Sequence, residues 1–348
     1  MKIKSGITAI LLLTALLLSG CKKNSQKITE KKSEYIPPRK ITIGFSIDTL
    51  AIERWQRDLD IFINKVKELG ADVIVQNAGN SVEEQKRQLI YLMERNVDVV
   101  VVVPKDATSI TEPVQKIRSK NIPVISYDRL TLNTDIDLYV TINTEKVGEQ
   151  MAIGLLQQTK GKNWYLILGP EEDYNMTFIK QGVNKILRNT NVNISHIFYT
   201  DGWNYDLSYQ EMTRLLANDE IPDAIICGND AVATSVIQAI NRYHPDSHIP
   251  ICGQDADIAA CQNIVKGIQD FTIYKPIAKL AELAAEYAVY MAKKEDIYEK
   301  SYPIKTINNG KSDIPVIWLD PVMVNKNNLD SVIISSGFHT ANSVYGAE

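Results

Sequence analysis

Charged side chains follow an apolar run at a point where an α/β protein would place a binding site. The segment "PVISYDRLT", residues 123–131, begins like an interior strand and ends on Asp128 beside Arg129. An ionised carboxylate only accepts hydrogen bonds, whereas a guanidinium only donates them. The pair therefore suits a ligand whose groups both donate and accept. Mutual attraction between the two charges would offset part of the cost of burying them.

Similar residues follow apolar runs elsewhere in the chain. "IERW" supplies Arg54 and Trp55 in the first half. Five further candidates lie in the second half: Asn175, Trp203, Asn229, Asp255 and Lys275. The nine residues comprise two carboxylates, three cations, two amides and two indoles. A sugar matches this set, because each hydroxyl both donates and accepts hydrogen bonds and the C–H faces are apolar enough to lie against an indole.

Each single residue also has a purely structural interpretation. An Asp or Asn before a helix most often caps its free N–H groups, and we assign Asp230 and Asp257 to that role. A tryptophan such as Trp55 near a helix start is often part of the core. Lys275 precedes Pro276, which favours an extended lysine and a helix that opens at the proline. A site is therefore indicated by the whole set and not by any one member.

Short β-rich runs alternate with longer amphipathic segments from residue 41 onward. In the first half, apolar runs are separated by segments with helical periodicity at 51–69, 81–95 and 109–119. The alternation restarts after "LYVTINTEKVGE", where a new helix begins. Further helices are expected near 174–188, 207–217, 230–242 and 276–293. Apolar strands separated by helices indicate parallel sheets covered on both faces, so we predict two doubly wound, Rossmann-like α/β units. Ligands bind outside the carboxyl ends of such strands.

The N-terminus has the features of an export signal. Lys2 and Lys4 precede the apolar run "AILLLTALLL", and residues 1–21 end in "LSGC". This stretch is short for a membrane span. Its ending resembles a bacterial lipobox, which would leave Cys21 lipid-modified and anchored to the outer face of the cytoplasmic membrane. The alternative is an ordinary signal peptide with an incidental cysteine. Residues 22–40 are polar and are predicted to be a flexible tether.

The composition excludes some classes of partner and cofactor. The 348 residues, 45% of them hydrophobic, fit two well-filled globular units. A formal net charge of −4 shows no basic excess, so no nucleic-acid partner is expected. No close cluster of metal ligands and no glycine-rich phosphate loop occurs, so neither a metal nor a cofactor is expected. Three cysteines remain downstream, an odd number that predicts no complete disulfide framework: Cys227, Cys252 and Cys261.

The order of several segments resembles the bacterial D-xylose-binding proteins, a branch of the periplasmic pentose- and hexose-binding proteins that includes the ribose binders. The likeness runs from about residue 41 to 339 and covers "IERWQRDLDIF", "YDR", "NTEKVGE", "DGW", "GQDAD", "YKP", "TINNG" and "VNKNN". It implies a type I architecture of two lobes joined by a three-segment hinge. The first lobe would contain 41–143 and 276–302. The second would contain 144–275 and 303–348, whose tail we expect to add edge strands and a covering segment.

The same resemblance implies a sugar site, with D-xylose as the ligand and one indole from each lobe. Carried over position by position, its contacts would be Arg54, Trp55, Asp128, Arg129, Asn175, Trp203, Asn229, Asp255 and Lys275. The implied partner is a membrane protein. It would be the permease of an ABC sugar importer or, alternatively, a sensor histidine kinase of a two-component system, and the sequence leaves both open.

Two other classes of protein fit part of the pattern. Asp128 and Asp255 could imitate the carboxylate pair of a glycosidase. However, the sequence has no G-x-S-x-G or H-E-x-x-H motif, and its four histidines are scattered. A sugar-responsive repressor shares the two-lobe core but carries a helix-turn-helix where this chain has a signal and tether. We therefore expect a binding protein without catalytic residues.

Overall fold

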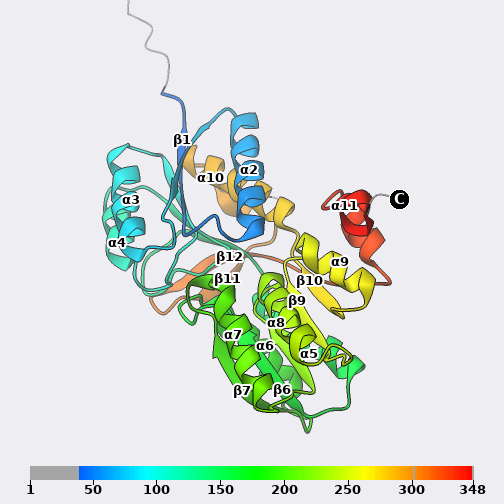
Figure 1. Ribbon diagram of the computed structural model, residues 1–348. Coiled ribbons are helices and arrows are strands. Elements are labelled where there is room, and N and C mark those ends of the chain that lie inside the picture. The colour runs from blue at the N-terminus through cyan, green and yellow to red at the C-terminus, as the bar shows by residue number, and fades with distance from the viewer. Residues whose placement is uncertain (1–38, 301, 347–348) are drawn as a thin grey trace, which may run out of the picture. The chain divides into compact units, whose positions relative to one another are not determined.

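The two predicted α/β units are present in the computed structural model, which describes residues 39–300 and 302–346. Each unit is a mostly parallel sheet with helices on both faces (Figure 1). The unit with the seven-stranded sheet is called the first lobe, and the unit with the six-stranded sheet the second lobe. The predicted signal peptide 1–21, the lipid site Cys21 and nearly all of the tether 22–40 lie outside the described residues.

The sheet of the first lobe has the order β11-β12-β5-β4-β3-β1-β2, and only β11 and β12 pair antiparallel. Its strands are β1 (Thr42–Ile47), β2 (Asp72–Asn77), β3 (Val99–Val102), β4 (Val124–Tyr127), β5 (Leu138–Ile142), β11 (Lys305–Asn308) and β12 (Asp313–Leu319). Its helices are α2 (Glu53–Glu68), α3 (Val82–Glu94), α4 (Thr111–Ser119), α10 (Ile277–Ala292) and the short η2 (Ile297–Glu299). Helices α2 and α10 pack together on one face, and α3 and α4 on the other (Figure 1).

The sheet of the second lobe has the order β13-β10-β9-β8-β6-β7, and only β13 runs antiparallel to its neighbour. Its strands are β6 (Asn163–Leu168), β7 (Asn193–Tyr199), β8 (Ala224–Cys227), β9 (Ile251–Gln254), β10 (Phe271–Tyr274) and β13 (Val322–Asn325). Its helices are α5 (Thr144–Gln158), α6 (Asn175–Leu187), η1 (Asp201–Trp203), α7 (Tyr205–Ala217), α8 (Asp230–Tyr243) and α9 (Ile258–Lys266). The chain ends with a π-helical turn, η3 (Asp330–Ile334), and with α11 (Ala341–Tyr345), which packs on α9.

The helices expected from the amphipathic pattern begin and end within two residues of their predicted bounds. Local signals explain several ends. The Ser81 side chain accepts a hydrogen bond from the N–H of Glu84 and caps α3. Gly267 ends α9 in a left-handed conformation with φ 73°, which glycine adopts without strain.

The tail differs from the expected lobe assignment. We expected all of 303–348 to belong to the second lobe. Instead, β11 and β12 extend the first sheet, where β12 pairs parallel with β5, and the chain joins the second sheet only at β13. Two residues separate β12 from β13, and both strands are short apolar runs, so no local signal marks the change of sheet. The chain thus crosses between the sheets three times: after β5, after β10 and after β12.

The cysteines of the second lobe lie in the interior of the protein. Cys227, Cys252 and Cys261 are buried and unpaired. None of the helices in residues 39–300 and 302–346 combines the length and the hydropathy needed to cross a bilayer.

Two glycines allow α5 and α6 to pack closely. An added Cβ on Gly182 would lie 2.0 Å from Glu145 O, and one on Gly148 would lie 2.1 Å from Ile179 O. Both obstacles are backbone atoms, which cannot rotate away. We predict that Gly182→Ala lowers the free energy of unfolding in urea by about 1–3 kcal/mol, although alanine is the better helix former. The exposed neighbour Gln181→Ala should change it by less than about 0.5 kcal/mol. Equal stability of Gly182→Ala and wild type would contradict this packing.

Candidate binding site between the lobes

The nine predicted site residues lie on the wall of one cavity. Arg54 and Trp55 come from the first turn of α2, and Asp128 and Arg129 follow β4. The second lobe supplies five residues from the start of α6, from η1 and from positions just after β8, β9 and β10: Asn175, Trp203, Asn229, Asp255 and Lys275. All nine are buried. The structure therefore brings the whole predicted set together, while their contact with a ligand stays a prediction.

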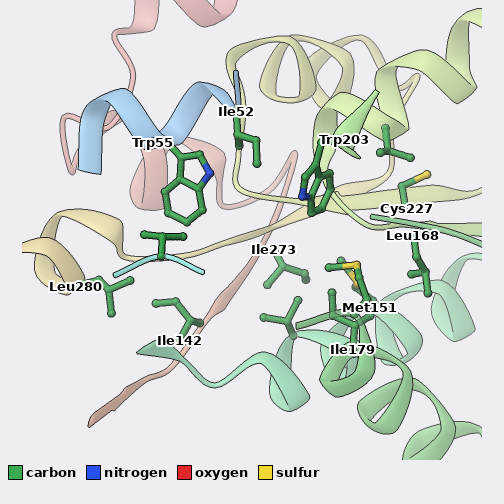
Figure 2. Close-up of a cluster of buried hydrophobic side chains, with 14 of the residues drawn as sticks. Ile52, Trp55, Ile142, Met151, Leu168, Ile179, Trp203, Cys227, Ile273 and Leu280 are labelled. Atoms are coloured by element: carbon green, nitrogen blue, oxygen red, sulfur yellow. The ribbon is translucent and has the colours of Figure 1, made fainter. Parts of the chain in front are cut away.

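Trp55 and Trp203 reach the cavity from opposite lobes. Figure 2 shows the two indoles with their nitrogen atoms on the sides that face each other, and both line the same cavity. Neither indole N–H has a hydrogen-bond partner among the described residues. A buried donor without a partner is costly, so both indoles are available to a polar ligand. The Arg54 guanidinium lies 4.3 Å from the centre of the Trp55 ring and holds it in place.

Arg54 connects carboxylates of both lobes. Its Nη1 lies 2.8 Å from Asp128 Oδ2 and 3.7 Å from Asp255 Oδ1. Its Nη2 donates to Asp58 Oδ2 at 2.7 Å, and the Tyr127 hydroxyl donates to the same oxygen at 2.7 Å. Asp58 lies one helical turn after Arg54, a spacing at which ion pairs form on a helix. The guanidinium is therefore fixed from behind while its other edge faces the cavity.

Arg129 is held by two carboxylates that the sequence analysis did not include. Its Nη1 donates to Asp48 just after β1, and its Nε lies 2.6 Å from Asp173 Oδ2 in the second lobe. We expected attraction between the neighbours Asp128 and Arg129 to offset their burial. The attraction of Arg129 does help to lower the pKa of Asp128, but each of the two forms its direct ion pairs with other residues. Strand β4 ends at Tyr127, and the left-handed turn at Asp128 places its carboxylate beside Arg54 of α2.

The polar residues of the second lobe also contact one another and the first lobe. Lys275 Nζ lies 2.7 Å from Asp255 Oδ1. The Asn175 Nδ2 donates to Asp128 Oδ1 across the lobes at 3.1 Å. Each carboxylate that lines the cavity therefore has a donor from the second lobe within reach.

The helix caps next to the site differ from the prediction. Asn229 caps α8 by accepting a hydrogen bond in the first turn, which leaves its side-chain NH₂ group free of that role. The assignment of Asp230 as a cap is wrong: its carboxylate is fully buried and accepts hydrogen bonds from Gln269 and Thr272. A carboxylate inside a protein needs such donors more than the helix needs a second cap. Asp257 stands at the N-cap position of α9, but its side chain makes no capping hydrogen bond.

Three site residues have left-handed backbone conformations. The φ angle is 61° at Asp128, 56° at Trp203 and 97° at Asp255. Residues with a side chain rarely adopt such angles, and they do so where the surrounding structure holds them. The hydroxyls of Tyr139 and Thr141 donate to the carbonyl of Asp128 at 2.8 and 2.7 Å. These bonds stabilise the turn that brings Asp128 to the cavity.

The surrounding charges keep Asp128 ionised. Burial alone would raise the pKa of this carboxyl, but the attraction of Arg54, Lys275 and Arg129 holds the pKa below its usual value. Glycoside hydrolysis needs a carboxylic acid that keeps its proton near neutral pH, and Asp128 does not suit that role. In the described part of the chain, no group of three or more His, Cys, Asp or Glu residues is placed to hold a metal ion. The site therefore favours binding by fixed charges.

The cavity is nearly closed by its own side chains. The open space has a volume of about 20 Å³, room for about one water molecule. Contacts between the lobes surround it: Lys105 Nζ lies 2.6 Å from Glu172 Oε1, and Asn80 Nδ2 donates to Gly202 O at 3.0 Å. A ligand the size of a sugar ring can enter only if the lobes separate first.

A larger cavity of about 380 Å³ lies beside the first crossover, with Trp318 in its wall. Its charged residues already pair with one another, since Lys185 Nζ lies 3.0 Å from Glu145 and 2.6 Å from Glu149. Among the described residues, none that lines it has a buried polar atom without a partner. The two indole N–H groups and Gln254 Oε1 are such atoms, and they belong to residues of the smaller cavity. We therefore take the smaller cavity as the candidate site.

Sequence reasoning missed four residues that line this cavity, Ile52, Asp173, Met176 and Gln254. It also missed Asp48 and Asp58, which pair with the two arginines of the site. Asp48 follows the apolar run of β1 in the way that Asp128 follows β4, so the same signal could have found it. Asp58 stands four residues after the arginine that it holds, which is a recognisable ion-pair spacing. Asp173 lies in "EEDYNM" beside two other acidic residues, and nothing local separates it from them.

Two lobes that meet at the carboxyl ends of their strands, with three crossovers between them, have the architecture of a two-lobe binding protein. Residues 43–296 match the family described as "Periplasmic binding protein domain", and the chain belongs to this family. It is 37% identical to the "D-xylose-binding periplasmic protein" of Haemophilus influenzae, covering 88% of this chain and 92% of the relative. It is 36% identical to the protein of the same name from Escherichia coli K12, covering 86% and 92%.

A solved structure supports the same architecture. The carbohydrate transporter solute binding protein from Chloroflexus aurantiacus, determined in complex with D-glucose, superposes with a TM-score of 0.80 at 24% sequence identity. The match covers 88% of this chain and 98% of that one. At this identity the likeness concerns the fold.

Asp230 should give the protein a measurable pH dependence of stability. Burial raises the pKa of Asp230 to about 7, although hydrogen bonds from Thr272 and Gln269 oppose the rise. Because an Asp in the unfolded chain has a pKa of about 4, the folded protein binds the extra proton between about pH 4 and 7. The contribution of this carboxyl to the free energy of unfolding is therefore largest below pH 4. It falls as the pH rises to 7, by at most about 1.4 kcal/mol per pH unit.

We predict that Asp230→Asn removes this fall, so that its stability relative to wild type increases from pH 4 to pH 8. Urea denaturation at several pH values measures the difference. The exposed Asp60→Asn is the control and should run parallel to wild type. A parallel curve for Asp230→Asn would show that the carboxyl of Asp230 does not titrate in this range.

Proposed function

We propose that the protein captures D-xylose between its two lobes outside the cytoplasm and presents it to an ABC importer. The main support is the convergence of two indoles, carboxylates, cations and amides on one cavity between the lobes. The names of the two relatives, both D-xylose-binding periplasmic proteins, favour this sugar. The protein would act by binding alone, without catalysis.

The residues would share the sugar according to their chemistry. Asp128 and Asp255 would accept hydrogen bonds from sugar hydroxyls, and the three cations would donate to sugar oxygens. Trp55 and Trp203 would cover its apolar C–H faces. The side chains already stand charged and oriented by their partners, so little ordering is needed when the sugar enters.

Closing of the lobes would follow from the distribution of the site residues over both lobes. The first lobe contributes Arg54, Trp55, Asp128 and Arg129, and the second lobe contributes the other five residues. A sugar held by only one lobe loses about half of its contacts. It therefore stabilises the closed arrangement over the open one.

Export and anchoring complete the proposal. The signal-like residues 1–21 and the "LSGC" ending support a mature protein that begins at a lipid-bearing Cys21. The polar segment 22–40 would let the lobes reach a partner at the outer face of the membrane. Metabolic labelling with a fatty-acid analogue tests the anchor: wild type should be labelled, and Cys21→Ser should not.

Calorimetry with D-xylose and a panel of other pentoses and hexoses tests the proposed function. D-xylose should bind most tightly, and aryl xylosides should release no phenol on incubation. Absence of heat with every sugar would refute the sugar-binding proposal. Binding of another pentose or hexose in place of D-xylose would correct the ligand.

The carboxylates should carry a measurable share of the affinity. Asp128→Ala and Asp255→Ala should each weaken D-xylose binding by about 1–3 kcal/mol or more, because buried donors lose their acceptor. Asp60→Ala is the matched control, an exposed aspartate of α2, and should bind as wild type does. Unchanged affinity in either site variant would remove that residue from the site.

The ion pair between Lys105 and Glu172 should contribute to closure without touching the sugar. Its atoms lie 2.6 Å apart and belong to different lobes. We predict that Lys105→Glu weakens D-xylose binding by about 1 kcal/mol, mainly through faster dissociation. The exchanged pair, Lys105→Glu with Glu172→Lys, should restore most of the loss in stopped-flow measurements. Failure of the exchange to restore binding would argue against a closing role.

The partner can be identified in cells. Deletion of the gene should abolish uptake of labelled D-xylose at low concentration if the protein serves an importer. Normal uptake combined with loss of xylose-induced transcription would replace the importer with a sensor kinase.

A further inference from the structure

The turn that carries Trp203 has a fixed backbone. Gly202 and Trp203 both have φ 56°, and the Trp203 N–H donates to Thr200 O at 3.2 Å. From the first lobe, Asn80 Nδ2 donates to Gly202 O at 3.0 Å. The turn is thus held by its own lobe and by the opposite one. The position of the Trp203 indole therefore does not vary through movement of this turn.

The Trp203 indole packs directly against Gly169, the residue after β6. An added Cβ on Gly169 would lie 2.3 Å from Cη2 and 2.4 Å from Cζ2 of Trp203, too close for non-bonded carbons. The φ angle of Gly169 is not positive, so the backbone at this position would accept a residue with a side chain, such as alanine. Glycine is therefore needed here for space alone. The crowded carbons belong to the six-membered ring of the indole.

We propose that Gly169 is a positioning residue of the sugar site, which sets how far the Trp203 indole extends into the cavity. This inference rests on the proposed function, because a sugar is the ligand that the indole would cover. A side chain at Gly169 would push the six-membered ring away from β6. The indole would then move toward Trp55, which lines the same cavity from the other lobe (Figure 2). The space for a sugar ring would shrink although Gly169 itself touches no sugar.

A double-mutant cycle tests this role. Gly169→Ala should weaken D-xylose binding by about tenfold in calorimetry, because the displaced indole occupies part of the ring's space. Trp203→Phe keeps an aromatic face, but its single ring is shorter than the fused indole. The outer ring of the indole, which the new methyl group would meet, is then missing. In the Trp203→Phe background, Gly169→Ala should therefore cost less than about twofold. An equal loss in both backgrounds would overturn the proposal, since Gly169 would then act by another route.

Gly154 provides a matched control for general crowding. An added Cβ there would lie 2.3 Å from Cζ of Phe271, the same crowding against an aromatic ring outside the cavity. Gly154→Ala should lower the melting temperature about as much as Gly169→Ala does, yet bind D-xylose within about twofold of wild type. If Gly154→Ala weakens binding as strongly, the effect of Gly169→Ala is mere destabilisation and the proposal fails.

Tryptophan fluorescence gives a second readout that needs no sugar. The difference between wild type and Trp203→Phe isolates the emission of Trp203. Gly169→Ala should change this emission in the ligand-free protein, whereas Gly154→Ala should not. If wild type binds no sugar but the emission changes, the proposed function fails and the placement of the indole by Gly169 stands. If wild type binds D-xylose and Gly169→Ala alters neither affinity nor emission, only the role of Gly169 fails.

Discussion

Two buried guanidinium groups, each paired with carboxylates from both lobes, form the interaction on which the rest of the structure depends. A buried charge that loses its partner costs about 3–5 kcal/mol, so Arg54 and Arg129 must be surrounded wherever they lie. Arg54 has Asp58 and Asp128 in its own lobe and Asp255 in the other. Strand ends of both sheets have to converge here to supply these oxygens. The left-handed turns at Asp128 and Asp255 are a consequence of that demand.

In the same arrangement, direct pairing between the charged side chains competes with a sugar for one set of groups. In the closed arrangement the cations pair with the carboxylates directly, as Arg129 of the first lobe does with Asp173 of the second. A sugar has to enter between such partners. Its hydroxyls must then replace part of the ion pairing and hydrogen bonding that the cations and carboxylates had with each other. The affinity for the sugar is therefore the difference in free energy between a sugar-free and a sugar-bound site, in both of which the polar groups have hydrogen-bond partners. A site of this kind favours ligands whose groups both donate and accept hydrogen bonds, as hydroxyls do.

Much of the architecture was readable from sequence because it depends on local signals. The amphipathic period gave seven helices to within two residues but missed α9, and the rule that polar residues follow the apolar strands gathered all nine candidates into one cavity. The failures concern choices made only in three dimensions. Asp230 looks like a cap, yet its partners Gln269 and Thr272 come from a different part of the chain. Likewise, nothing in the apolar run of β12 indicates that it pairs with β5 in the first sheet and not with its sequence neighbour β13.

The three buried thiols bear on how the chain would survive in the oxidising compartment to which the proposed export would take it. Burial raises the pKa of Cys261 to about 12 and raises the pKa values of Cys227 and Cys252 well above their usual range. A thiol that stays protonated and inaccessible does not take part in disulfide exchange. The native fold thus protects its own cysteines, and the vulnerable period is the interval between emergence of the chain and completion of the second sheet. Covalent dimers joined through one of these three cysteines would accordingly come from chains that oxidised before they folded.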